Sequence, residues 1–253
     1  MVARFDGKVV LVTGGAGGIA RVTAAAFARE GALVVVSGRN ADALTEVVRE
    51  ITDAGGRADH VVADVSDPES AARMVATVVE RHGGLHVACN AAGILGEAAP
   101  LADVPVETWS QVLAVNLTGV FLSMKHEIAH MREHGGGAVV NIGSNIGVQQ
   151  RLPGVGAYAA SKAGVSVLSR AAAREHIADG VRVNVVSPGG TDTPMSYRPG
   201  EDRAARDARF AASVPSGRVS TPAEVAAAVL WLASDDSAHI VGHELVIDGG
   251  ATA

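Results

Sequence analysis

The order of three features near the N-terminus predicts an α/β fold with a doubly wound parallel sheet. A short apolar run, Val9–Val12, is followed at once by a glycine-rich stretch, 13–20, and then by an alanine-rich segment that ends near Gly31. A second apolar run, Leu33–Ser37, comes next. Continuous apolar runs are typical of strands buried on both faces of a parallel sheet, and a helix between two strands is the usual crossover.

Further apolar runs continue this alternation along the chain. They end at Ala63, just before Asn90 and at Ile142, and long helices are expected over 106–134 and 156–178. No linker or repeat interrupts the 253 residues, so we expect one domain over 1–253.

The glycine-rich stretch has the composition of a phosphate-binding loop. Gly14, Gly17 and Gly18 lie between the first strand and the helix that Ile19 begins. Glycines there let the backbone approach a pyrophosphate, whose charge is met by the N–H groups and positive dipole of the helix N-terminus. Surface turns also gather glycine, but the order of strand, loop and helix favours a nucleotide site.

The end of the second strand bears on which dinucleotide would bind. Ser37, Arg39 and Asn40 surround this end, and none of them offers a carboxylate for a ribose 2′-hydroxyl. A guanidinium suits a 2′-phosphate, so we predict NADP(H) over NAD(H); the alternative is a solvated loop arginine. Asp64 ends the third strand and could accept from an adenine amino group, or cap the helix that begins near Ser66.

Tyr158 and Lys162 lie one helical turn apart, and Ser144 lies upstream of them. A free phenol has a pKa near ~10, and we expect the neighbouring ammonium to lower it so that Tyr158 can donate and accept a proton. Any Tyr and Lys at this spacing share a helix face, so the pair alone does not establish a site. Hydride transfer to a carbonyl needs a proton donor and a hydrogen bond where negative charge develops, which Tyr158 and Ser144 would supply.

Together with Asn90-Ala91-Ala92-Gly93, Asn116 and the Pro188–Thr193 segment, these motifs resemble the short-chain dehydrogenase/reductase family over nearly the whole chain. The resemblance implies a Rossmann-type sheet of about seven strands, a last strand near 244–247 and a homotetramer formed through long helices. It also implies a catalytic tetrad, with Lys162 holding the nicotinamide ribose and Asn116 positioning a water. The tetrad is Asn116, Ser144, Tyr158 and Lys162.

The resemblance assigns cofactor contacts along most of the chain. These are Gly14, Gly17, Gly18, Ile19, Ser37, Arg39, Asn40, Asp64, Val65, Asn90, Ala91, Gly93, Tyr158, Lys162, Pro188, Gly189, Thr191 and Thr193. Three departures from the family pattern stand out. Ala20 replaces the third loop glycine, Ala91 replaces a second asparagine, and the interval from Ser144 to Tyr158 is about one residue longer than usual. The Ala91 change is expected to reduce side-chain hydrogen bonding in the central sheet.

The predicted substrate pocket is mainly apolar. Its expected residues are Ile94, Leu95, Ser144, Ile146, Gln150, Tyr158 and Met195. Residues 194–217 carry prolines and charges and are expected to form a lid. The arginines of this segment alternate with acidic residues, which favours a solvated helical surface over a site for an acidic substrate. The arginines are Arg198, Arg203, Arg206 and Arg209.

These features favour an NADP(H)-dependent reductase of a ketone or 3-oxoacyl group. The alternative is an NAD-dependent dehydrogenase of a cyclic alcohol or dihydrodiol, because segments 90–95 and 187–193 are similar to those of dihydrodihydroxybenzoate dehydrogenases. A cofactor-sensing binding protein is a third interpretation, against which the Tyr158 and Lys162 pair argues.

The composition of the chain argues against several other classes of protein and of binding site. The net charge of −6 and the scattered arginines argue against nucleic acid, and no apolar run approaches the ~20 residues of a membrane span. The histidines at 126, 130 and 134 lack nearby carboxylates or cysteines, which favours a solvated helix face over a metal site. The single cysteine, Cys89, excludes an internal disulfide and suits the cytoplasm.

Overall fold

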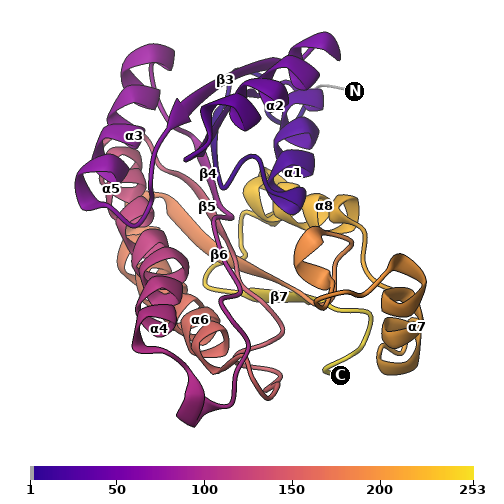
Figure 1. Cartoon of the computed structure of the whole chain (residues 1–253). Helices are drawn as coiled ribbons and strands as arrows, with labels where there is room; N and C mark the ends of the chain where they lie inside the picture. The colour runs from indigo at the N-terminus through magenta and orange to yellow at the C-terminus, as the bar shows by residue number, and fades with distance from the viewer. Residues whose placement is uncertain (1–2) are drawn as a thin grey trace.

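The computed structural model describes residues 3–253 and contains a seven-stranded, all-parallel sheet (Figure 1). The strand order is β3-β2-β1-β4-β5-β6-β7, so the order reverses between β1 and β4. The strands are β1 Val9–Thr13, β2 Leu33–Gly38, β3 Arg57–Val62, β4 Val87–Asn90, β5 Gly137–Ile142, β6 Val181–Pro188 and β7 Glu244–Ile247. This confirms the predicted doubly wound fold.

Helices cover both faces of the sheet. They are α1 Gly18–Arg29, α2 Ala41–Asp53, α3 Pro68–His82, α4 Val106–Leu113, α5 Gly119–Glu133, α6 Gly156–His176, α7 Arg203–Ser213 and α8 Pro222–Ala233. In Figure 1, α3, α5, α4 and α6 lie on one side of the sheet, α1, α2 and α8 lie on the other, and α7 stands apart beyond β7. No helix in residues 3–253 is both long and apolar enough to cross a membrane.

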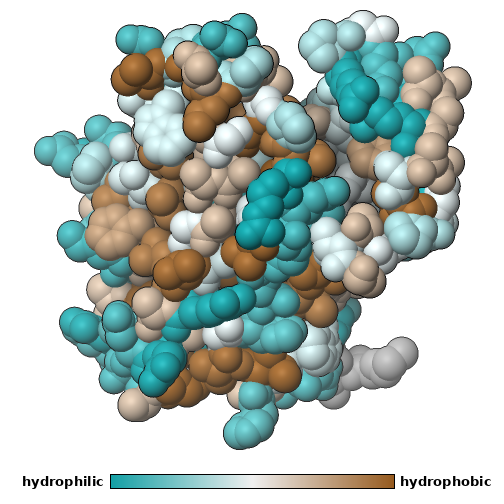
Figure 2. All heavy atoms as spheres, turned by 90° about the horizontal axis from the view of Figure 1, so that it is seen from below, coloured by the Kyte–Doolittle hydropathy of each residue, from teal (hydrophilic) through white to brown (hydrophobic). Residues whose placement is uncertain are grey.

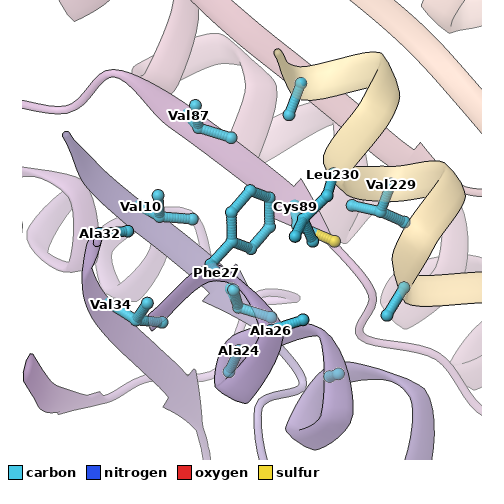
Figure 3. Packing of buried hydrophobic residues seen from close by; sticks show 14 of the residues in the cluster. Val10, Ala24, Ala26, Phe27, Ala32, Val34, Val87, Cys89, Val229 and Leu230 are labelled. Carbon is cyan, nitrogen blue, oxygen red and sulfur yellow. The ribbon is translucent and has the colours of Figure 1, made fainter. Parts of the chain in front are cut away.

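Two apolar clusters fill the layers between the sheet and its helices. On the α1 and α8 side, the ring of Phe27 lies between the strands and α8, beside Val10, Cys89 and Leu230 (Figure 3). The opposite cluster joins β4 and β5 to α3, α5 and α6 through residues such as Met74 and Met131. Since strand side chains alternate between faces, both clusters use the same strands, which explains their continuous apolar runs.

The predicted long helix over 106–134 is interrupted. Residues Ala114–Thr118 form a π-helical turn between α4 and α5, and Asn116 lies within it, fully buried. A π turn inserts one residue into the hydrogen-bond ladder and is frequent at functional sites. The hydrophobic periodicity of the segment did not reveal this change in helical winding.

Candidate active site

The loop after β1 approaches its neighbours so closely that only glycine fits. Gly14 has a φ of 68°, and a Cβ there would lie 2.8 Å from Cα of Ala92. At Gly18 a Cβ would lie 2.8 Å from Cγ2 of Thr193, so the glycine loop touches the loop after β6. α1 begins at Gly18 with Gly17 as its N-cap, a residue without a side chain. Its first N–H groups therefore face outward uncapped, and an anion can accept their hydrogen bonds.

Arg39 lies between the end of β2 and the start of α2, and its side chain is exposed. Neither an ion pair nor a side-chain hydrogen bond joins it to another residue in the described part of the chain. Ser37 is buried, and its hydroxyl has no partner within residues 3–253. Asn40 caps α2, with Oδ1 accepting from the Ala43 N–H at 3.1 Å. The Arg39 guanidinium, between β2 and α2, is thus available to bind a ligand.

Asp64 does not cap the following helix, contrary to one of the two expectations for it. Asp67 is the N-cap of α3 and accepts from the Ser70 N–H at 2.6 Å. Asp64 instead accepts from the N–H and hydroxyl of Ser66, and these bonds hold the pKa of its carboxyl below the usual range, with a smaller contribution from Arg39. Val65 follows it, buried against Gly119.

Side chains of β1 and α5 hold the end of β4 and the turn that follows it. Thr13 Oγ1 accepts from the N–H groups of Ala91 and Ala92, at 3.2 and 3.4 Å. Asn90 points away from this turn, and its Nδ2 donates to Glu127 and to Asn141. The sequence pattern did not show these bonds to Thr13 and Glu127, and the expected effect of Ala91 on hydrogen bonding in the central sheet stays a prediction.

Tyr158 lies in the first turn of α6, and its side chain is 8% exposed. Burial raises the pKa of its phenol, and a side-chain hydrogen bond with Ser144 partly opposes this. The expectation that Lys162 lowers this pKa is wrong for the structure as it stands. The ammonium lies 5.8 Å from the centre of the phenol ring, and the pKa of the phenol is set by its burial and by Ser144.

Lys162 is buried, and its Nζ donates to the carbonyl of Ile142 at 2.7 Å. Burial lowers the pKa of its ammonium to about 8. Gly93 lies beside it, because a Cβ there would be 3.6 Å from Lys162 Nζ and 3.4 Å from Asn116 Oδ1. The structure thus brings the turn after β4 together with two of the four predicted catalytic residues.

Three hydrogen bonds hold the side chain of Asn116. Its Oδ1 accepts from the Ile94 N–H, and its Nδ2 donates to the Ile94 carbonyl, both at 2.8 Å. Nδ2 also donates to Ser161 Oγ at 3.1 Å, and Ser161 donates to the Tyr158 carbonyl at 2.7 Å. Ser161, which sequence reasoning missed, therefore ties the π turn to the helix of Tyr158. Its place between Tyr158 and Lys162 in the sequence was the only signal for it.

The loop after β6 is held by the C-terminal segment. The Gly189 N–H donates to the Ile247 carbonyl at 2.8 Å, and the Asn145 amide donates to Asp248 at 3.3 Å. Pro188 ends β6, Thr191 is buried, and the Thr193 hydroxyl donates to the Thr191 carbonyl. These bonds place the loop opposite Gly18.

Four predicted substrate residues lie in one apolar cluster with Val112, Val155 and Ala157. They are Ile94, Leu95, Ile146 and Tyr158. Gln150 pairs with Ile146 through a β-bridge, whereas Met195 is 46% exposed outside the cluster. The segments that follow β4 and β5 run to the bottom of Figure 1. Seen from that side, the surface carries several apolar patches separated by polar residues, and a lobe stands apart (Figure 2).

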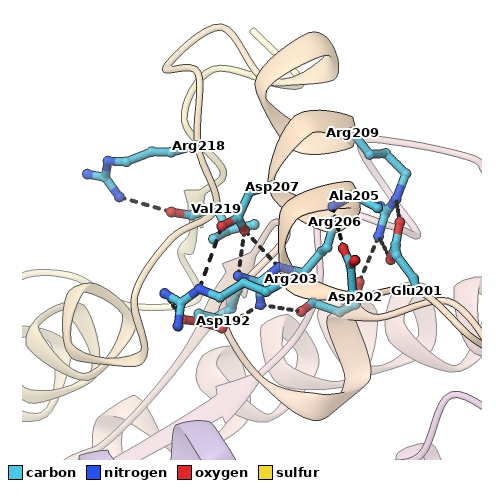
Figure 4. A network of polar contacts seen from close by, with 12 residues as sticks. Asp192, Glu201, Asp202, Arg203, Ala205, Arg206, Asp207, Arg209, Arg218 and Val219 are labelled. Carbon is cyan, nitrogen blue, oxygen red and sulfur yellow. Dashed lines mark hydrogen bonds and ion pairs between the residues drawn. The ribbon is translucent and has the colours of Figure 1, made fainter.

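Ion pairs of the buried Arg206 and the partly exposed Arg209 hold the segment 194–217 in place (Figure 4). The Arg206 side chain is fully buried, paired with Asp192 and Asp207, and stacks on the ring of Tyr197 at 4.5 Å. Arg209 pairs with Glu201 at 2.7 Å. The expectation of a solvated helical surface is thus wrong for Arg206, because its acidic partners lie on the neighbouring loop as well as on α7.

Comparison with known proteins agrees with this geometry. Residues 14–252 match a family model described as Enoyl-(Acyl carrier protein) reductase. The chain is 42% identical over 250 residues to the cis-4-hydroxycyclohexanecarboxylate dehydrogenase of Sinomonas cyclohexanicum, covering 98% of each protein. It is 38% identical over 247 residues to a 3-oxoacyl-(acyl-carrier-protein) reductase of Thermotoga maritima, again covering 98% of each. The crystal structure of levodione reductase superimposes with a TM-score of 0.94 at 33% identity, covering 98% of this chain and 99% of that one.

A dinucleotide-type sheet with a buried Tyr and Lys beside a glycine loop defines a nicotinamide-dependent oxidoreductase. The chain belongs to the short-chain dehydrogenase/reductase family, and it is an oxidoreductase of the class that acts on alcohols and ketones.

Proposed function

We propose that this protein transfers hydride between NADP(H) and a ketone or secondary alcohol, with Tyr158 as the general acid or base. The observation that carries the proposal is the buried Tyr158 phenol, which lies one helical turn from the buried Lys162.

The residues present fit a dinucleotide. Gly14 and Gly18 let the loop after β1 pack closely against Ala92 and Thr193, and the N-terminus of α1 would hold the pyrophosphate. Arg39 would pair with the 2′-phosphate, and Thr191 and Thr193 would flank the nicotinamide. When bound, the nicotinamide supplies or accepts the hydride.

The chain's own residues handle the proton. In reduction, Tyr158 gives its phenolic proton to the oxygen on which negative charge develops, while Ser144 donates a hydrogen bond to the same oxygen. Lys162, charged below pH about 8, would stabilise the phenolate that remains. Asn116 would hold the adjoining backbone of Ile94 in place. In oxidation the same proton returns to Tyr158.

The substrate that the site favours is small and mainly apolar around its carbonyl. The support is the cluster of Ile94, Leu95 and Ile146 against Tyr158. A second candidate is an NAD-dependent oxidation of a cyclic alcohol, which the cis-4-hydroxycyclohexanecarboxylate dehydrogenase relative favours. The exposed Arg39, without a carboxylate beside it on β2, favours NADP(H).

The assembly that we propose is a homotetramer that acts in the cytoplasm. Support for the tetramer is a groove of about 680 Å³ along the outer faces of the π turn, α5 and α6, lined almost entirely by apolar side chains. The free, buried thiol of Cys89 is compatible with a reducing compartment.

The test is a panel of cyclic and open-chain ketones and alcohols, assayed by nicotinamide absorbance with each cofactor. Tyr158→Phe should lose at least ~1000-fold in turnover because the proton donor is gone. It should keep its affinity for cofactor, measured by titration calorimetry. Turnover by the Phe variant comparable to that of the native enzyme would defeat the assignment.

A further inference from the structure

A chain of buried polar side chains crosses the layer between the sheet and its helices behind the proposed site. It runs from Ser169 on α6 through Asn141 on β5 and Asn90 on β4 to Glu127 on α5. All four side chains are fully or almost fully buried. Glu127 is a carboxyl on the helix stripe that also carries the buried Met124, Ile128 and Met131.

The direction of every hydrogen bond in this chain is set by its first member. The Ser169 hydroxyl donates to the Val165 carbonyl at 2.6 Å, so its oxygen accepts from Asn141 Nδ2. Asn141 Oδ1 must then accept, and Asn90 Nδ2 donates to it at 3.0 Å. The second hydrogen of the same Nδ2 goes to Glu127 Oε2 at 2.9 Å. The orientation of the Asn90 amide is therefore fixed.

Two oxygens at the end of the chain lack a donor. Among the described residues, Asn90 Oδ1 and Glu127 Oε1 are both buried without a partner. The hydroxyl of Ser123, one turn earlier on α5, also has no partner, so it bonds to neither oxygen. The Nδ2–Oε2 bond places the Asn90 amide beside the Glu127 carboxyl, and without a donor each of these two oxygens carries the cost of an unmade buried bond.

We propose that Glu127 is a neutral carboxylic acid in the folded protein, that its Oε1–H donates to Asn90 Oδ1, and that this pair positions the end of β4. One proton satisfies both oxygens and closes a cyclic acid–amide pair with the Nδ2 bond already present. An ionised carboxylate offers no such hydrogen.

The pair matters for the site because Asn90 leads directly into the turn after β4. The next two N–H groups, of Ala91 and Ala92, donate to Thr13, and Ala92 packs against Gly14 of the phosphate-type loop. Holding the Asn90 side chain in place therefore also holds the turn after β4, which brings Gly93 beside Lys162. Glu127 is a positioning residue, and this part of the inference rests on the proposed function.

The surroundings of Glu127 favour the neutral form. Burial raises the pKa of its carboxyl to about 7, and only the Asn90 hydrogen bond opposes the shift. α3 presents apolar side chains, β5 presents Asn141, and α6 presents Ser169, while Lys162 of α6 is committed to the Ile142 carbonyl. The titratable neighbour on β4 is the thiol of Cys89, whose pKa is raised to about 12 chiefly by burial, so it is neutral as well. No cation therefore compensates a Glu127 carboxylate.

The raised pKa of Glu127 determines whether the stability of the folded protein rises or falls with pH. The folded state holds the Glu127 proton above the ordinary value of 4.5, up to a pKa of about 7. Stability from this group is therefore complete below pH 4.5, falls as the pH rises to about 7, and is constant above it. Glu127→Gln replaces the O–H by an N–H that donates to the same oxygen at every pH.

The experiment compares thermal unfolding midpoints of the wild type and Glu127→Gln between pH 4.5 and 9. The quantity compared is the unfolding midpoint of Glu127→Gln less that of the wild type. We expect this difference to increase by roughly 5 °C between pH 4.5 and pH 7 and to stay constant at higher pH. An infrared band of a protonated carboxyl should be present in the wild type at pH 5, fade by pH 8, and be absent from the variant. A difference in midpoint that is flat with pH, or no such band in the wild type, overturns the proposal.

Cofactor affinity tests the positioning role separately from protonation. Glu127→Met, which removes the donor, should weaken cofactor binding about three- to tenfold at pH 6, and Glu127→Gln should restore it. Equal affinities of the three proteins would refute the positioning role. If no nicotinamide cofactor binds the wild type at all, the proposed function fails, while the infrared and unfolding results still decide the protonation of Glu127.

Discussion

At the scale of single residues, burial sets the protonation of the site more strongly than neighbouring charges do. Tyr158 and Lys162 shift in opposite directions, the phenol upward and the ammonium downward, and burial is the leading cause of both. Both shifts favour the neutral forms of the two groups. Tyr158 is therefore protonated before reaction, as the reduction of a carbonyl requires.

Replacing Lys162 with methionine should reveal the cost of burying its charge. The folded pKa of about 8 lies below the ordinary 10.5, so the folded state binds fewer protons between these values and native stability rises with pH across them. Lys162→Met should be more stable than the wild type by up to about 3 kcal/mol below pH 8, and this advantage should shrink towards pH 10.5. Denaturant unfolding at several pH values measures it.

The exposed Lys125 is the matched control. Lys125→Met should change the free energy of unfolding by less than about 0.5 kcal/mol at every pH. A Lys162→Met advantage that does not vary with pH would contradict the account.

Cofactor choice should depend on Arg39. Arg39→Ala should weaken NADPH binding by about 10- to 100-fold and change NADH binding by less than about threefold, since only the 2′-phosphate meets the guanidinium. Titration calorimetry with both cofactors measures this. Arg49→Ala is the control, because Arg49 is exposed on α2 but paired with Glu46 and Asp53. Equal losses for both cofactors would show that Arg39 does not read the phosphate.

Residues with a distinctive spacing could be predicted from the sequence, and residues that act through a partner could not. The glycine loop, Ser144, Tyr158 and Lys162 stand in a recognisable order, and the structure brings them to one edge of the sheet. Glu127 and Ser161 gave no such signal, because their partners Asn90 and Asn116 lie 37 and 45 residues away. A charged residue on an apolar helix stripe was the only indication of Glu127.

At the scale of elements, α7 is attached to the loop after β6 mainly by two features. One is the Arg206 pair with Asp192, and the other is Phe210, whose ring leaves no space for a side chain at Gly190. The segment that we predict to be a lid is therefore packed against the loop that would hold the nicotinamide.

Arg206→Gln should loosen this lid. It removes the charge pairs with Asp192 and Asp207, and we expect amide hydrogen exchange across 203–213 to become at least about tenfold faster, equivalent to about 1.4 kcal/mol. The KM for the carbonyl substrate should rise as well. Exchange mass spectrometry resolves α7 from the rest of the chain.

Arg203→Gln is the control for this prediction. Its side chain is 74% exposed on the same helix and approaches the same two aspartates at 3.7 Å. Exposed pairs contribute little, so exchange in this variant should stay close to that of the wild type. Equal exchange in the two variants would show that burial of Arg206 does not hold the lid.

Element ranges could be predicted well where hydrophobic periodicity alone determines them. The strand runs appear where expected, since strands buried on both faces must be apolar throughout. The break at Ala114–Thr118 could not be predicted, because the apolar stripe continues through it. The helix is interrupted by the bonding of Asn116 to Ile94, a tertiary interaction.

At the scale of the whole molecule, an apolar surface along α5 and α6 remains uncovered. Phe121 is 46% exposed and Val167 is 66% exposed on the walls of the groove between these helices. Burying the exposed part of such side chains against a second copy would gain about 1–2 kcal/mol each, roughly half to two thirds of the value for burial from full exposure.

We expect a tetramer by size-exclusion chromatography with light scattering, and Val167→Glu should reduce it to smaller species. Val62→Glu is the matched control, since Val62 is 53% exposed at the edge strand β3, away from α5 and α6. A monomeric wild type would rule out the assembly, and dissociation by both variants would show that the groove is not the interface.

The last residues of the chain bear on how the protein is made. The loop after β6 is tied to Ile247, and the end of the lid segment to Gly249, through backbone bonds of 2.8 and 3.0 Å. Ile247 and Gly249 follow their partners Gly189 and Ser216 in the sequence, so these bonds can form only after the residues between them have been synthesised. A nascent chain can fold β1 and its glycine loop early, but it acquires the proposed nicotinamide end of the site only after β7 has been made.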